Sequence, residues 1–371
     1  MGSAPAHAEP IISAPAQSRP AHDVPSHDIP SLDGLRALSI AIVILSHTKS
    51  LLPSPIANSG LFRYVIGGGL HGVQIFFVIS GYLITTLLLR EYDRTGSVSF
   101  KRFYARRALR IFPPFYTYFT VLAILWITGV IPEHWPTYLA SATYTFIYLP
   151  NPHGWYVEHA WSLSIEEQFY LLWPALLVYA HRRAKSISLA VAIIALIPIV
   201  RLALHLTAPS PERAIVTSSS ADTLMTGCLL ALLSNRIAWK KVQRRFLNAW
   251  TAALLLIIGF LLVPYLNAKL TGGILAILTV AIGNTVTSLS IGGVLLYVTD
   301  NPQSPAGKFL NLRFVRHMGV ISYSLYLWQQ LFTGDPAHMH LYIYLWMLVA
   351  AELSFWLIEK PEMRFRTRLN L

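Results

Sequence analysis

The chain has 371 residues, of which 54% are hydrophobic and only 12% are charged, and its mean hydropathy is +0.50. These values exclude an ordinary soluble globular protein, and repeated apolar runs of spanning length indicate a helical protein that crosses a lipid bilayer several times. The net charge of +12 does not indicate nucleic-acid binding, because basic residues in the short loops of membrane proteins set their orientation.

The first thirty residues differ in composition from the rest of the chain. Residues 1–30 are rich in Pro, Ala, Ser and His and show no periodicity, which predicts a disordered tail. They lack the basic and apolar regions and the cleavage site of a secretory signal peptide, so we expect the first span to remain in the mature protein. The sequence thus predicts a membrane domain over residues 31–362 and a basic cytoplasmic tail over residues 363–371.

The first apolar stretch carries two ionisable groups, Arg36 and His47. Their spacing of eleven residues is about three helical turns, so both side chains leave the same face, about 16 Å apart along the axis. Asp33 is predicted to cap the start of this helix. Arg36 alone also fits a lipid anchor and His47 an ordinary interfacial residue, but ionisable groups that share one face of a membrane helix indicate a functional site.

The apolar runs predict an all-α bundle of about ten transmembrane helices. The predicted spans are 34–51, 70–90, 111–130, 161–181, 186–206, 220–235, 247–267, 271–299, 318–334 and 341–359. Lys and Arg cluster after every second span, which places both termini in the cytoplasm. A crossing at residues 137–149 would invert all later basic loops, so this segment is predicted to be a short re-entrant or surface helix on the outer side.

Small and basic residues mark the second span and the loop after it. Gly72, Ser80 and Gly81 let helices approach closely in a bilayer. Arg107 and Arg110 are three residues apart and so are neighbours on a helical face at the cytoplasmic border. Such a pair suits bidentate binding of phosphate, although it also fits an anchor in lipid headgroups.

The fourth, fifth and sixth spans also contain polar groups. Ser162 or Ser164 is predicted to cap the helix that holds Glu166 and Glu167. These two carboxylates suit the helix dipole, or one of them orients an imidazole or stabilises its protonated form. Arg201 and Asp222 are candidates for a mutual ion pair. The single cysteine lies in an apolar helix, and no His/Cys spacing indicates a metal site.

Taken in order, five motifs resemble the membrane acyltransferases of the acyltransferase-3 type. They are Arg36-x10-His47, the run GVQIFFVISGYLIT, Arg107-x-x-Arg110 before IFPPFY, the run WSLSIEEQFYLLWP, and ISYSLYLW. The resemblance covers residues 31–362. It implies a multi-pass protein of the bacterial inner membrane that acylates sugar hydroxyls of surface polysaccharides, lipopolysaccharide, Nod-type oligosaccharides or macrolides. The implied donor is cytoplasmic acetyl-CoA or another acyl-CoA, with no tightly bound cofactor.

The resemblance also implies roles for particular residues. It makes His47 catalytic and Arg36, Arg107 and Arg110 functional basic groups, for which we expect contacts with the donor's phosphates, and it matches Glu166 to the acidic position of the fourth motif. The chain departs from many relatives in having Gln329 where they have histidine. We also expect a membrane domain without the SGNH hydrolase-like extension of some relatives.

Two mechanisms and one rival function remain open at this level. His47 acts either as general base on the acceptor hydroxyl or as a transient acyl carrier, with Glu166 holding the imidazole in the useful tautomer. The rival is a transporter or flippase whose polar route is lined by Arg36, His47, Glu166 and Asp222. The sequence does not identify the acceptor, the acyl chain length or the oligomeric state.

Overall fold

The computed structural model describes residues 29–368, apart from 68, 133, 150–153, 208–210, 235, 271 and 334–339. Nearly all of the predicted tail, 1–30, lies outside the described residues. The described part contains helices and turns and no strand, which confirms the all-α class. Its α-helices are α1 (Leu32–His47), α2 (Ser54–Ala57), α3 (Leu70–Thr95), α4 (Phe100–Ile127), α5 (Trp135–Ala142), α6 (Ala160–Arg182), α7 (Ser186–Thr207), α8 (Pro211–Ser234), α9 (Ile237–Phe246), α10 (Ala249–Ile257), α11 (Val263–Lys269), α12 (Gly273–Asp300), α13 (Pro305–Leu310), α14 (Arg313–Val320), α15 (Ser322–Phe332), α16 (Ile343–Ser354) and α17 (Lys360–Arg368).

Five helices of the described part are long and apolar enough to cross a membrane. They are α3, α4, α7, α12 and the continuous helix Ala249–Lys269, in which a π-helical turn, Ile258–Leu262, joins α10 to α11. Another π-helical turn, Phe355–Glu359, joins α16 to α17. The larger number of about ten spans and the position of the termini remain predictions.

The predicted ninth span and the segment 137–149 both form helices too short to cross a membrane. The predicted span 318–334 is broken, because α14 ends at Val320 and α15 begins at Ser322. The eleven residues of α15 extend about 16 Å, roughly half of a hydrocarbon core. The segment 137–149 contributes to the eight-residue helix α5 and the 3₁₀ turn Phe146–Tyr148, both too short to span.

The starts of α1 and α6 differ from the predicted caps, because each helix begins earlier than expected. Ser31 occupies the cap position of α1, so Asp33 lies inside the first turn and its carboxylate is 3.1 Å from the Arg36 guanidinium. In α6 the cap position belongs to His159. The hydroxyls of Ser162 and Ser164 instead donate to carbonyl oxygens of the preceding turn.

Glycines set how closely α3 packs against its neighbours. A Cβ atom at Gly81 would collide with the backbone of Leu224 in α8, and one at Gly227 of α8 would collide with Val78 of α3. Gly72 meets α1 in the same way. The predicted small-residue face of the second span is therefore a close contact between helix backbones on two sides of α3.

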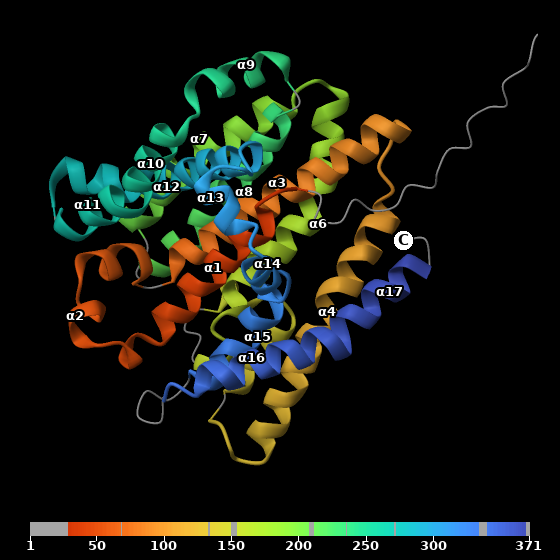
Figure 1. Ribbon diagram of the computed structural model, residues 1–371, viewed down its shortest axis with the longest axis vertical. Coiled ribbons are helices and arrows are strands. Elements are labelled where there is room, and N and C mark those ends of the chain that lie inside the picture. Colours follow the sequence, from red (N-terminus) through yellow and green to blue (C-terminus); the bar gives the residue numbers. More distant parts are fainter. Residues whose placement is uncertain are drawn as a thin grey trace, which may run out of the picture.

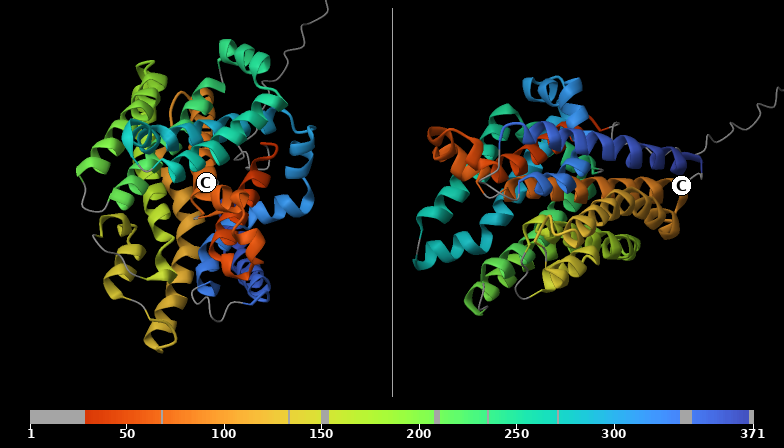
Figure 2. Two further views of the ribbon diagram at one scale, coloured as in Figure 1. Left: turned by 90° about the vertical axis from the view of Figure 1, so that its left-hand side faces the viewer. Right: turned by 90° about the horizontal axis from the view of Figure 1, so that it is seen from below.

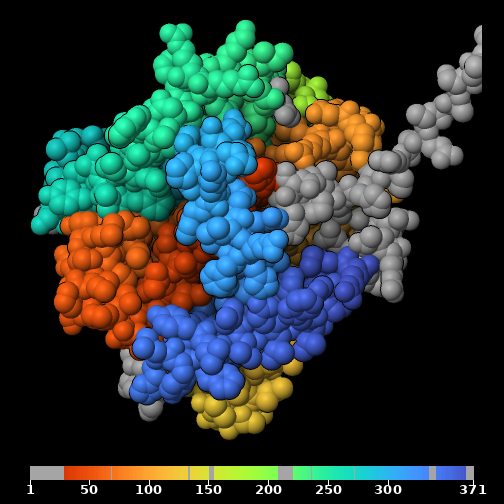
Figure 3. Space-filling view, in the orientation of Figure 1, coloured from red at the N-terminus to blue at the C-terminus, as the bar shows by residue number. Residues whose placement is uncertain are grey.

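The remaining helices enclose α1 and α3. Figure 1 shows α9 to α12 on one side of α1, and the right-hand view of Figure 2 shows α17 running beside α4 and extending from the helical body. Helix α17 and the preceding π-turn contact α4. Figure 3 shows α13 to α17, in blue, lying across one face of the molecule and covering α1.

A buried ion pair joins the later helices. Arg201 of α7 and Asp222 of α8 are fully buried, with 2.7 Å between guanidinium and carboxylate, so the predicted pair is confirmed. Thr285 of α12 also donates to Asp222. The pair thereby links three helices.

Candidate active site

A cavity between α1, α3, α4, α6 and α15 collects most of the predicted site residues, and we name it the arginine cavity. Its polar lining is Arg36, Ser80, Arg107, Arg110, Ser162, Glu166, Glu167, Tyr170, Ser322, Tyr323 and Tyr326. Its apolar lining includes Val73, Phe76, Phe77 and Leu83. Four of the five predicted residues, Arg36, Arg107, Arg110 and Glu166, therefore meet at one place although they come from three helices.

The charges of the arginine cavity favour an anionic ligand. Three arginines of the lining stand against two glutamates. The Arg107 guanidinium lies over the ring of Tyr170, 5.4 Å from its centre, which holds the cation on the cavity wall. Guanidinium groups present planar pairs of donors that match phosphate oxygens. The cavity is thus chemically suited to phosphate.

Glu166 lies at the arginine cavity and does not contact His47. Its carboxylate accepts hydrogen bonds from the hydroxyls of Ser80 and Tyr170. The expectation that Glu166 orients the imidazole is therefore wrong for this structure. The physical reason is that Ser80 of α3 and Tyr170 of α6 already bind the Glu166 carboxylate, whereas His47 lies against Gln329 of α15.

His47 ends α1, and its partner is Gln329 of α15. The imidazole Nδ1 is 2.6 Å from the Gln329 side-chain oxygen. The indole of Trp155 meets the ring edge-on, with 5.1 Å between ring centres. Arg36 of α1 lines the arginine cavity, and so do Ser322 and Tyr326 of α15, the helix that also carries Gln329. Both ionisable groups of α1 therefore face α15, as their spacing predicts.

The structure adds a second imidazole, His159, to which the sequence assigned no role. The Gln330 side-chain oxygen accepts the backbone N–H of His159 at 3.0 Å and closely contacts its Nδ1. This oxygen only accepts, so Nδ1 is protonated, and Nε2 has no hydrogen-bond partner among the described residues. Burial lowers the pKa of His159 to about 4. The sequence feature that could have indicated a buried partner for His159 is the Gln329–Gln330 pair, two adjacent amides in an apolar helix.

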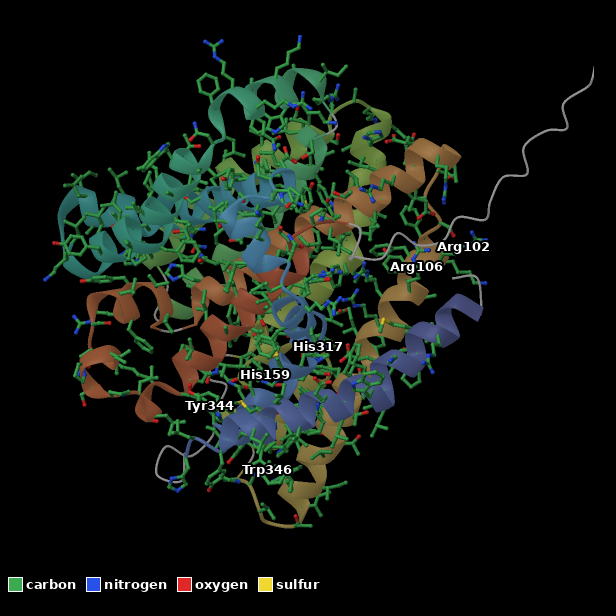
Figure 4. The ribbon with its side chains drawn as sticks, in the orientation of Figure 1. Arg102, Arg106, His159, His317, Tyr344 and Trp346 are labelled. Atoms are coloured by element: carbon green, nitrogen blue, oxygen red, sulfur yellow. The ribbon has the colours of Figure 1, made fainter. Side chains whose placement is uncertain are left out.

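Hydroxyl groups connect the arginine cavity to the backbone of His159. Tyr326 lines the cavity, and its hydroxyl is 2.5 Å from that of Ser162, which donates to the His159 carbonyl at 3.0 Å. The rings of Tyr118 and Tyr326 both meet the His159 ring edge-on. Figure 4 shows His159 in the interior, far from Arg102 and Arg106 near the start of α4. His159 therefore adjoins the cavity lining through Ser162 and Tyr326.

The family model of the acyltransferase domain matches residues 29–359, which include every helix of the arginine cavity and both imidazoles. The chain belongs to the acyltransferase-3 family. The match confirms the resemblance inferred from the five motifs. No solved structure matches the chain.

Curated relatives of this acyltransferase-3 chain are O-acetyltransferases by name. Peptidoglycan O-acetyltransferase OatA of Listeria monocytogenes is 30% identical over 89% of this chain and 55% of its own length. O-acetyltransferase OatA of Staphylococcus aureus is 29% identical over 89% of this chain and 56% of its own length. The chain thus spans a little over half the length of the relatives it matches.

Proposed function

We propose that this acyltransferase-3 chain is a membrane O-acyltransferase that moves an acetyl group from cytoplasmic acyl-CoA to a glycan hydroxyl. One observation carries the proposal. The same helix, α1, supplies Arg36 to the arginine cavity and, eleven residues later, His47 to a site where its Nδ1 is held by a buried amide. Helix α1 thereby connects a group suited to phosphate, Arg36, with a basic nitrogen on His47.

In this proposal the anionic end of the donor lies on Arg36, Arg107 and Arg110. The acyl arm extends past Tyr326 toward His47, over about 16 Å of helix rise. His47 Nε2 takes the proton of the acceptor hydroxyl while the hydroxyl oxygen attacks the thioester carbonyl. The C–O ester bond forms, the C–S bond breaks, and the CoA sulfur leaves as a thiolate that takes up the proton held on His47 Nε2.

The acceptor is proposed from the relatives. The name of the Listeria monocytogenes relative specifies peptidoglycan, so a peptidoglycan sugar is the first acceptor to test. Acylation of a surface glycan requires a protein in the bacterial cell membrane, which agrees with the apolar helices of the described part. No nucleic acid enters the reaction.

The test is acetyl transfer by membranes that contain the protein. Membranes are incubated with radiolabelled acetyl-CoA and peptidoglycan, and label in the glycan is counted. We expect His47→Ala to lower transfer by about 100-fold or more, because a positioned general base contributes about 10²- to 10⁴-fold. The exposed His340 provides the matched control, and His340→Ala is expected to keep full transfer. Undiminished product from His47→Ala would contradict the proposal.

The same assay separates the acyltransferase from the transporter. If the protein is an acyltransferase, radiolabelled acetyl-CoA is the sole added donor that membranes need to label the glycan. A flippase moves an acceptor across the bilayer without incorporating label from acetyl-CoA, so unlabelled glycan from wild-type membranes would favour that alternative.

A further inference from the structure

Gln329 is a buried amide in α15 with an unusual neighbour. Its side chain is 0% exposed, and its carboxamide oxygen lies 2.6 Å from Nδ1 of His47, 282 positions away in the chain. A carboxamide oxygen only accepts hydrogen bonds, so Nδ1 carries a proton. A neutral imidazole has one N–H group, so the lone pair is on Nε2.

The next residue repeats the arrangement. Gln330 contacts Nδ1 of His159 through its oxygen, whose placement is fixed by the backbone N–H that it also accepts. Two consecutive amides of α15 therefore hold two imidazoles in the same tautomer. Such second-layer partners commonly decide which ring nitrogen of a functional histidine reacts.

The partner of His47 is neutral, which distinguishes this pair from a histidine–carboxylate pair. Glu166, the acid expected at this place, contacts Ser80 and Tyr170 instead. The titratable groups whose charge reaches the imidazole are Glu158 and His159. An amide fixes ring orientation and tautomer without adding a charge that would favour the imidazolium form.

We infer that Gln329 is the positioning residue of His47, holding Nδ1–H so that Nε2 is the nitrogen presented to the acceptor hydroxyl. This inference rests on the proposed function. Gln329 acts only through His47 and does not touch the reacting atoms.

The experiment compares three variants in purified, detergent-solubilised full-length protein. Gln329→Ala removes the acceptor oxygen and is expected to lower kcat about 10- to 100-fold, with the KM for acetyl-CoA unchanged. Gln329→Glu keeps the oxygen but adds a charge that stabilises the imidazolium form. We expect it to move the acidic limb of the pH–rate profile upward by about 1 to 3 pH units. Gln168→Glu, an amide-to-acid change in α6 outside the arginine cavity lining, is the matched control and should leave the limb in place.

The outcomes separate the inference from the function on which it rests. A merely structural Gln329 would lower the yield of folded protein in both variants without moving the acidic limb, and this result would overturn the inference. If Gln329→Ala does not accumulate, the pH profile of the nearly isosteric Gln329→Glu decides. If His47→Ala keeps its activity, the proposed function fails. If His47→Ala is inactive while both Gln329 variants behave like wild type, the inference about Gln329 fails and the proposed function stands.

Discussion

Among the described residues, three arginines converge on one cavity. Arg36, Arg107 and Arg110 line a cavity between helices, whereas Arg102 of the same helix α4 is exposed. Half-buried guanidinium groups that converge on one space favour an anion with several oxygens. At the scale of residues, the cavity is therefore where a donor phosphate is expected.

Removing one arginine of the arginine cavity is expected to weaken binding of the acyl donor more than binding of the acceptor. For Arg107→Gln and Arg110→Gln we expect the KM for acetyl-CoA to rise about 10- to 100-fold each, because hydrogen bonds to charged groups contribute about 1.5–3 kcal/mol. Steady-state kinetics with both substrates varied measures the effect, and Arg102→Gln is the matched control. A rise in the acceptor KM alone would show that the phosphate assignment is wrong.

The lowered pKa of His159 predicts how the stability of the protein depends on pH. Its pKa is about 4 in the folded protein and about 6.5 in the unfolded chain. Above pH 6.5 both states are neutral at this ring, so its contribution is fully present there. As pH falls from 6.5 to 4 the unfolded state binds the proton first, and stability is lost. Thermal unfolding at pH 7 and pH 5 should show a smaller acid-induced fall for His159→Gln than for wild type; an equal fall would contradict the assignment.

At the scale of elements, α3 is the helix on which the site depends. It supplies Val73, Phe76 and Ser80 to the arginine cavity from one side and packs closely on α8 through Gly81 on another. In a bilayer such contacts are stabilised by van der Waals packing, because lipid tails are as apolar as the helix surface. The position of the cavity wall therefore depends on the absence of a side chain at Gly81.

Adding a methyl group at Gly81 tests this dependence. Gly81→Ala should lower the free energy of unfolding by about 1–3 kcal/mol, since the new Cβ collides with the Leu224 backbone, which cannot rotate away. Gly60→Ala places its Cβ at an ordinary distance from Tyr64 and serves as the control. Thermal unfolding in detergent measures both, and equal stability of the two variants would show that α3 and α8 tolerate a wider spacing.

At the scale of the whole molecule, charge asymmetry predicts orientation. The exposed basic helix α9 and the arginine-rich start of α4 belong to loops expected on the cytoplasmic side. The donor cavity must open toward that side for cytoplasmic acyl-CoA to enter. Orientation is thus a requirement of the proposed function as well as a property of the sequence.

Cysteine labelling tests this orientation directly. The native Cys228 is fully buried, so introduced cysteines are expected to dominate the reaction with an impermeant maleimide. In intact cells we expect the exposed Asn58→Cys to be labelled and the exposed Lys240→Cys to be labelled only after permeabilisation. The inverse pattern would place the arginine cavity on the wrong side for a cytoplasmic donor.

The sequence by itself determined the features that depend on local geometry. Apolar runs identified the all-α class, and helical periodicity placed Arg36 and His47 on one face and Arg107 beside Arg110. The small-residue face of α3 also followed from residue type alone. These properties need only the rise and turn of one helix and the preference of apolar side chains for lipid.

Only the tertiary structure decided which polar groups meet. It paired His47 with Gln329 and Glu166 with Ser80 and Tyr170, and it broke the predicted ninth span at Ile321. Partners separated by up to 282 positions are brought together by the packing of several helices, which no local pattern encodes.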